Sequence, residues 1–267
     1  IKILDLIFSS KQAVIIAGGG VKNSESHNEV IKLATLANIP IVSSAGHGDA
    51  IPFNEKLYAG QMGPRGNPIA SKLVKNADVI LALGTRLGFN STFFSNEIID
   101  NKSTIIQVDI DKKSLGRYFK IELGICNDVQ NLISQLLVEL IKRHKHPVIN
   151  DWTNEFLNQK TKYLKDRDKN ADLLTHPIQP TGLFKILRDT LPQNTAVTLD
   201  AGTLCLQATD MINYFKTRSF FTPLDFGLVG FSFACGLGVK LAKPECPVVS
   251  LMGDGGFGMS LSEISTA

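Results

Sequence analysis

The sequence has few cysteines, no long apolar run and little excess charge, and each shortage excludes a class of protein. Its four cysteines stand far apart, with neither the paired spacing of a zinc site nor the density of a disulfide framework. Reduced thiols in a cytoplasmic protein are therefore expected. No apolar run approaches the roughly 20 residues that span a bilayer, and 28 basic against 25 acidic residues leave only +3. Neither a membrane nor a nucleic acid is expected as a partner.

The ends of the sequence also lack a signal. The start, Ile1–Leu4, has no Met and does not have the basic-then-apolar order of a signal peptide, so secretion is not expected. Residue 1 and the segment 260–267 both fall within helical patterns. We therefore expect the sequence to be an internal piece of a longer protein.

What the sequence does contain, in 267 residues with 43% hydrophobic residues and 22 glycines, is an alternation of strand and helix patterns. Short apolar runs rich in β-branched residues are separated by helical segments, which is typical of parallel sheets covered on both faces. Strands are expected at 13–17, 39–43, 78–84, 104–110, 121–125, 196–199 and 248–252. Helices are expected at 24–37, 68–76, 128–142, 152–164, 180–191, 204–214 and 231–241.

Between residues 144 and 176 the composition becomes polar and rich in Lys and Asn, and the alternation starts again afterwards. The predicted fold class is α/β, with two doubly wound parallel-sheet domains. We expect a Rossmann-like central domain at 1–143, a linker at 144–176, and a second domain at 177–267 that is cut short.

The turn Gly253-Asp254-Gly255-Gly256 ends one predicted strand and leads into a helix. Glycines let a backbone approach a phosphate, and the free N–H groups of a helix's first turn attract an anion. The Asp254 carboxylate is a hard oxygen ligand of the kind that Mg²⁺ takes together with substrate phosphates. The turn therefore indicates a phosphate and metal site. The alternative is a tight strand–helix turn in which Asp254 only caps the helix.

The order of the segments around this turn resembles the cofactor domain of thiamine-diphosphate enzymes of the acetohydroxyacid synthase group. The resemblance rests on the run 226–231, the small-residue helix after it, Lys240–Pro244 and Gly253–Met259. It implies that Asp254 binds Mg²⁺ and that Val229 supports the bent cofactor. The implied cofactor-binding residues are Asp200, Gly202, Thr203, Leu204, Gly227, Leu228, Val229, Gly253, Asp254, Gly255, Gly256 and Phe257.

Two residues in this region have alternative roles. Asp200 caps the next helix, serves the cofactor, or does both, and Cys205 is expected to be a small packing residue rather than a reactive thiol. In the family, a second metal ligand and the catalytic glutamate lie outside the segments present here. The resemblance therefore implies that the 267 residues anchor the cofactor and have no activity on their own.

The first half resembles the family's central domain, which holds FAD in some members and ADP or nothing in others. The resemblance rests on Gly18–Gly20, Gly60–Gly63, Gly84–Arg86 and Asp109–Asp111. Glycines permit close approach to a phosphate, Arg86 can pair with it, and Asp109 can accept from ribose hydroxyls. Candidate nucleotide-binding residues are Gly18, Gly19, Gly20, Gly84, Thr85, Arg86, Asp109 and Asp111, with His47 in a loop near the same strand ends. A central domain without a nucleotide is the alternative.

Within the family, short strings at 63–68, 81–87 and 200–205 are most similar to sulfoacetaldehyde acetyltransferases. The resemblance implies an enzyme that makes or breaks a carbon–carbon bond, using thiamine diphosphate and Mg²⁺ on a small carbonyl or 2-oxo acid substrate. In an acetyltransferase, phosphate is the acceptor. The resemblance also implies at least a homodimer. One alternative is an acetolactate synthase or pyruvate oxidase type with FAD in the central domain. Another, of a different class, is a non-catalytic nucleotide-binding protein.

Overall fold

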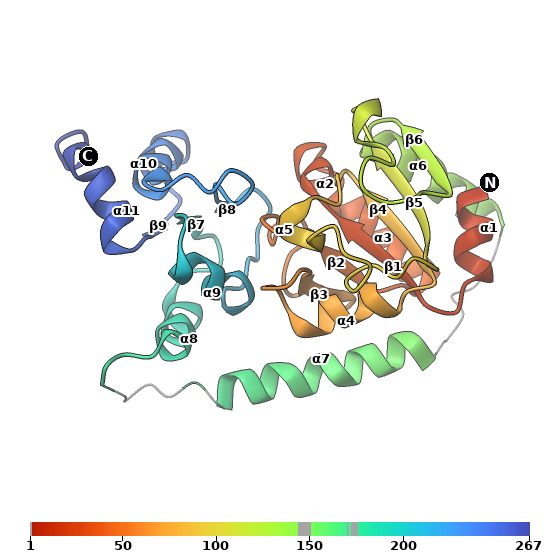
Figure 1. The fold of residues 1–267 in the computed structure, drawn as a ribbon, viewed down its shortest axis with the longest axis horizontal. Coiled ribbons are helices and arrows are strands. Elements are labelled where there is room, and N and C mark those ends of the chain that lie inside the picture. The colour runs from red at the N-terminus through yellow and green to blue at the C-terminus, as the bar shows by residue number, and fades with distance from the viewer. Residues whose placement is uncertain (1, 144–150, 170, 172–175) are drawn as a thin grey trace.

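The structure, a computed structural model, describes residues 2–143, 151–169, 171 and 176–267. It contains a six-stranded sheet and a three-stranded sheet, lying side by side with helices around each (Figure 1). The expected α/β class is confirmed. The first part of the expected linker, residues 144–150, lies outside the described residues.

The larger sheet has the strand order β3-β2-β1-β4-β5-β6, and all of its strands pair in parallel. This is the order of doubly wound nucleotide-binding folds. In these folds the strand order reverses beside the first strand, which leaves a crevice at the carboxyl ends of the strands. The strands are β1 (Ala13–Ala17), β2 (Ile41–Ser43), β3 (Tyr58–Gln61), β4 (Val79–Leu83), β5 (Thr104–Asp109) and β6 (Leu123–Cys126).

Alternate residues of β1 point to the two faces of this sheet and enter separate cores. Ile15 and Ala17 pack with helices α1 (Lys2–Ser9), α3 (His27–Ala37) and α6 (Val129–Lys142). Val14 and Ile16 pack on the opposite face with α4 (Pro68–Asn76). Both faces are therefore covered, as the nearly continuous apolar strands predict.

The smaller sheet has the order β8-β7-β9, again parallel, with β7 (Ala196–Leu199), β8 (Phe220–Phe221) and β9 (Val248–Leu251). On one face, α8 (Pro180–Thr190) and α9 (Thr203–Met211) contribute Phe184, Cys205 and Ala208 to a buried core. On the other face lies α10 (Phe231–Ala242). A methyl group on Gly236 of α10 would lie 2.2 Å from the Ser250 hydroxyl, so the small residues of this helix allow it to pack closely on the sheet, as predicted.

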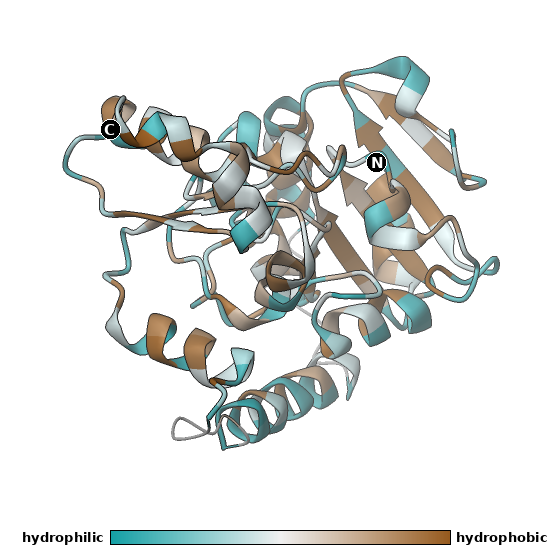
Figure 2. Ribbon diagram, turned by 60° about the vertical axis from the view of Figure 1, so that its left-hand side comes forward, coloured by the Kyte–Doolittle hydropathy of each residue, from teal (hydrophilic) through white to brown (hydrophobic). Residues whose placement is uncertain are grey.

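Helix α7 (Asp151–Lys169) lies within the segment that the composition marks as a linker. Its surface is largely hydrophilic, and it runs along one side of the molecule from the larger sheet towards α8 (Figures 1 and 2). Its first half nevertheless packs on the central domain, because Phe156 is 2% exposed and the Trp152 indole donates to the Ala13 carbonyl at 3.1 Å. The helix thus belongs to the body of the protein rather than to a free tether.

Most expected elements are present within one to three residues of their predicted ends, with clear exceptions. The expected helix 24–37 is two helices, α2 (Gly19–Asn23) and α3, so a helix already begins within the glycine triplet. The helix expected at 152–164 is α7, which continues to Lys169. The pattern did not reveal the short strands β3 and β8, the one-turn helix α5 (Phe89–Thr92) or the 3-10 turn Lys112–Ser114. In the segment 260–267, where a helical pattern was expected, the structure has the 3-10 turn Leu261–Ile264. None of the described helices is long and apolar enough to cross a membrane.

Candidate cofactor site

Asp200, at the carboxyl end of β7, brings three separate segments together. Its buried carboxylate accepts hydrogen bonds from the backbone N–H groups of Gly230, at 2.9 Å, and Ser232, at 3.1 Å. A methyl group on Gly256 would lie 3.0 Å from the same carboxyl carbon. The helix that Asp200 caps is therefore α10, and not the next helix along the chain, α9. Three of the predicted cofactor segments, around 200–204, 227–230 and 253–257, consequently converge at one edge of the smaller sheet.

The backbone of these segments is open where they meet. Gly202 and Gly227 have φ values of +129° and +71°, which favour glycine over any other residue. Among the described residues, no atom lies within 4 Å of a methyl group built on Gly202, Gly227, Gly253 or Gly255. Since Gly253 has an extended backbone, φ −80° and ψ 175°, neither its conformation nor its neighbours require glycine. The close approach of a ligand would explain why position 253 is a glycine.

Asp254 is the first residue of α11 (Asp254–Met259) and is exposed. Within the described part of the chain, its carboxylate has no hydrogen-bond or ion-pair partner, and no side chain serves as the N-terminal cap of α11. The expected alternative, in which Asp254 only caps the helix, is therefore not what the structure shows, because Gly253 occupies the N-cap position. The Asp254 carboxylate is free to bind a cation.

Apolar side chains flank this edge of the sheet. Leu228 and Val229 are 51% and 45% exposed, and Phe257 packs edge-on against Phe233 with ring centroids 6.2 Å apart. Cys205 is buried beneath the loop, where burial raises the pKa of its thiol to about 11. A thiol with a raised pKa is a poor nucleophile at neutral pH, which agrees with the prediction that Cys205 is a packing residue.

The glycines of the larger sheet are closed by contrast. A methyl group on Gly18 would lie 2.3 Å from the Gly84 carbonyl oxygen, and one on Gly20 would lie 2.5 Å from the Gly84 Cα. The turns after β1 and β4 thus pack backbone to backbone, and this contact by itself explains why glycine is present at these positions.

A cavity of about 470 Å³ lies in the crevice between these turns. Most of the predicted nucleotide residues line it: Gly19, Gly20, Gly84, Thr85, Arg86, Asp109 and Asp111. Two of them already have partners, because Asp109 accepts from the Asp111 N–H at 2.9 Å and Arg86 pairs with Asp225 at 2.6 Å. The cavity can hold a small ligand, and the Arg86 guanidinium that lines it is already paired.

The His47 ring lies across Gly19 in the same cavity, where a methyl group on Gly19 would come within 2.9 Å of it. Burial, and secondarily the nearby Lys22 charge, lower the pKa of His47, so its imidazole is neutral at pH 7. Among the described residues, its Nδ1 atom has no hydrogen-bond partner. The predicted approach of His47 to the strand ends is therefore present in the structure.

The sequence did not reveal how the two domains are joined. Asp49, fully buried, accepts from the backbone N–H groups of Ser219 and Phe220 at 3.0 Å each, while Lys22 pairs with Asp49 and donates to the Phe220 carbonyl. These four residues fix β8 to the central domain. No local sequence pattern signals a contact between residues about 170 positions apart.

The comparisons agree with this arrangement. Residues 1–136 match the family described as "Thiamine pyrophosphate enzyme, central domain", and residues 200–267 match "Thiamine pyrophosphate enzyme, C-terminal TPP binding domain". The chain is 32% identical over 283 residues to a sulfoacetaldehyde acetyltransferase of Castellaniella defragrans, and the match covers 98% of this chain and 47% of that protein. It is 31% identical over 269 residues to an acetolactate synthase large subunit of Buchnera aphidicola subsp. Schlechtendalia chinensis, covering 100% of this chain and 46% of that protein.

The chain thus spans about half the length of the curated relatives that it matches. The larger sheet lies in the first matched region, and β8, β9 and the glycine turn after β9 lie in the region described as binding thiamine pyrophosphate, which begins directly after β7. The chain belongs to the thiamine pyrophosphate enzyme family, whose central and C-terminal TPP binding domains it matches over residues 1–136 and 200–267.

Proposed function

We propose that the protein is a thiamine-diphosphate- and Mg²⁺-dependent enzyme that makes or breaks a carbon–carbon bond next to a carbonyl group. The observation that carries the proposal is the convergence of three segments on Asp200, which leaves Gly202, Gly253 and Gly255 open around a free Asp254 carboxylate. The residues fit the cofactor, because a diphosphate needs close backbone approach and Mg²⁺ needs oxygen ligands.

The roles of this chain's residues follow from their positions. The N–H groups at the starts of α9 and α11 point to the carboxyl edge of the sheet, where they can donate to phosphate oxygens. Asp254 would bind Mg²⁺. In the described part of the chain, no three His, Cys, Asp or Glu side chains gather at one place, so phosphate and water oxygens would supply further ligands, as is usual for this ion. Val229 and Leu228 would contact the cofactor's organic part.

Bound thiamine diphosphate supplies the nucleophilic carbon and the electron sink that this reaction class requires. For the substrate, we propose sulfoacetaldehyde with phosphate as acceptor. This choice is supported by the sulfoacetaldehyde acetyltransferases among the relatives, at 32% and 29% identity. We also propose the domain boundaries 1–143, 144–176 and 177–267, and a cytoplasmic location.

A second candidate, an acetolactate synthase or pyruvate oxidase type with FAD, is supported by the cavity at the crevice of the larger sheet and by the acetolactate synthase relatives. ADP is an alternative occupant. A flavin absorption spectrum in the purified full-length protein would favour this candidate, and a colourless protein would favour the acetyltransferase.

The large apolar side chains around the turn support at least a homodimer. Phe226, Met259 and Leu228 are 87%, 72% and 51% exposed. Large exposed apolar groups of this kind mark sites of protein contact. A monomeric full-length protein in light scattering would contradict this part of the proposal.

The function is tested by titrating the full-length protein with thiamine diphosphate and Mg²⁺ in a calorimeter. We expect tight, Mg²⁺-dependent binding that Asp254→Ala weakens by about 10- to 100-fold, because the variant loses a charged metal ligand. Glu245→Ala is the matched control, since Glu245 is also exposed but precedes the other end of β9. Absence of binding in the wild type would instead favour a non-catalytic nucleotide-binding protein.

A further inference from the structure

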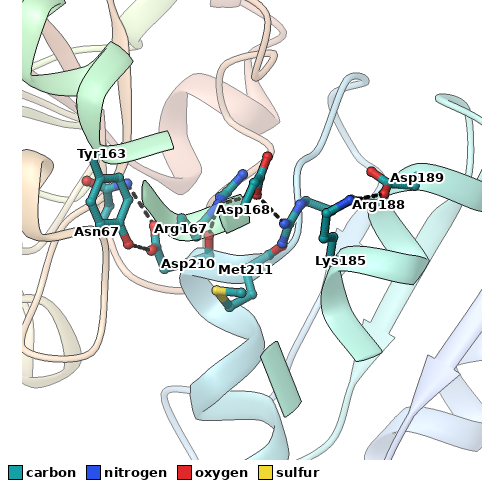
Figure 3. Close-up of polar contacts among 9 residues, drawn as sticks. All are labelled: Asn67, Tyr163, Arg167, Asp168, Lys185, Arg188, Asp189, Asp210 and Met211. Atoms are coloured by element: carbon teal, nitrogen blue, oxygen red, sulfur yellow. Dashed lines mark hydrogen bonds and ion pairs between the residues drawn. The ribbon is translucent and has the colours of Figure 1, made fainter. Parts of the chain in front are cut away.

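The C-terminal end of α9 is held by side chains from three other elements (Figure 3). Three successive carbonyls in its last turn each accept one hydrogen bond. Gln61 of β3 donates to Thr209 O at 2.7 Å. Arg167 of α7 and Arg188 of α8 donate to Asp210 O at 3.0 Å and to Met211 O at 2.6 Å. A helix leaves these carbonyls without partners within itself, so the surrounding protein satisfies them one by one.

The side chain of Asp210 adds a second set of bonds at the same place. Its carboxylate accepts from the Asn67 amide, at 2.8 Å, and from the Tyr163 hydroxyl. Asn67 begins α4 of the central domain, and Tyr163 lies on α7. Burial raises the pKa of Asp210, while these two hydrogen bonds oppose the rise. We call Gln61, Asn67, Tyr163, Arg167, Arg188 and Asp210 the α9 clamp.

The clamp is costly to rearrange because its charges are hidden from water. The side chains of Arg167 and Arg188 are 6% and 5% exposed, and both contact the half-exposed Asp168 carboxylate, at 3.3 and 2.6 Å. Two cations at a helix C-terminus also interact favourably with the helix dipole. Any shift of α9 would leave a buried guanidinium or carbonyl without its partner, so α9 has one well-defined position relative to the central domain.

The other end of α9 forms part of the proposed cofactor site. The helix begins at Thr203, directly after Gly202, and no side chain caps this end. Nine helical residues form a rigid rod about 13 Å long, so fixing one end fixes the other. We propose that the α9 clamp positions the Gly202–Thr203 wall of the cofactor site, and that its members are positioning residues for cofactor binding. The proposal rests on the function proposed above.

The double variant Arg167→Met with Arg188→Met tests the clamp, because methionine keeps much of the aliphatic packing and removes the donors. In the full-length protein without cofactor, we expect exchange of the first hydrogen-bonded amides of α9, from Leu206 onwards, to become at least about threefold faster, with α10 unchanged. We expect the dissociation constant of thiamine diphosphate, at saturating Mg²⁺, to rise about tenfold.

Lys185→Met is the matched control, since Lys185 lies on α8 one turn before Arg188 but pairs with Asp189 instead of α9 (Figure 3). It should change neither readout. Tyr163→Phe is a milder variant that removes one donor and should shift both readouts about two- to threefold in the same direction.

The outcomes separate the two proposals. If exchange at the start of α9 is faster in the double variant but the wild-type protein binds no thiamine diphosphate, the proposed function is overturned while the mechanical part of the clamp stands. If the variants lower the melting temperature but leave local exchange and the dissociation constant equal to those of Lys185→Met, the clamp is merely structural and the inference is wrong.

Discussion

The two glycine-rich turns of this protein look alike in sequence and differ in why glycine is there. After β1, Gly18 and Gly20 touch the backbone of Gly84, and a methyl group on either would lie within 2.5 Å of it. After β9, a methyl group on Gly253 or Gly255 would meet nothing within 4 Å among the described residues. The first turn is explained by the chain itself, whereas for the second we propose that a ligand is the reason.

This difference shows how a glycine motif is to be interpreted. A strand followed by glycines predicts close backbone approach, but the approaching group can be another strand-end turn of the same domain. In the larger sheet that group is Gly84, so the triplet Gly18–Gly20 gives no evidence for a nucleotide. The support for a nucleotide in this domain is the cavity beside the triplet.

The largest effect is expected from Gly18→Ala in the closed turn. The added methyl group would lie 2.3 Å from the Gly84 oxygen and 2.6 Å from the Thr85 Cβ, so the β1 and β4 turns must separate. We expect a loss of at least about 3 kcal/mol in the free energy of unfolding, measured by denaturant titration. Gly88→Ala, at an open glycine of the same domain, should cost about 1 kcal/mol or less. Equal losses in the two variants would contradict the closed packing.

Asp200→Asn is expected to have the next largest effect, because Asp200 holds the open turn's three segments together. The amide would place an NH₂ group against the N–H donors of Gly230 and Ser232. We expect a loss of about 2 kcal/mol in the stability of the smaller sheet, seen by hydrogen exchange in β7 and α10. Asp225→Asn, at an exposed residue, should change the stability of the smaller sheet by about 0.5 kcal/mol or less. A neutral Asp200→Asn would show that Asp200 does not organise the site.

Much of the fold could be predicted from the sequence. Strands such as β1 and β4 are short, apolar and bounded by polar or glycine residues, and the cap of α6 is visible because Asp128 precedes an amphipathic stripe. The two-residue strand β8 has no pattern of its own and forms only because it pairs with β7. The break between α2 and α3 likewise has no clear signal within 19–37.

The candidate site could be predicted in its parts but not in its assembly. Glycines and an acid at a strand end indicated the segment around Asp254, and the family resemblance added the segment around Asp200. The contact between Asp200 and Gly230 joins residues 30 positions apart, and that between Gln61 and Thr209 joins residues 148 apart. Such contacts depend on how the sheets pack, and no local preference encodes them. Whether the predicted residues bind the cofactor, the metal and a nucleotide stays a prediction.

The central claim, that the turn after β9 is open because a cofactor lies there, is tested most directly by comparing Gly253→Ala with Gly258→Ala. Both glycines are open and exposed, both are in or next to α11, and only Gly253 belongs to the predicted site. Calorimetry on the full-length protein with Mg²⁺ should show about tenfold weaker thiamine diphosphate binding, or about 1.4 kcal/mol, for Gly253→Ala. That variant should lose no more than about 1 kcal/mol of stability, the cost of alanine at a helix N-cap, and Gly258→Ala should bind as the wild type does. Equal affinities in the two variants would contradict the claim.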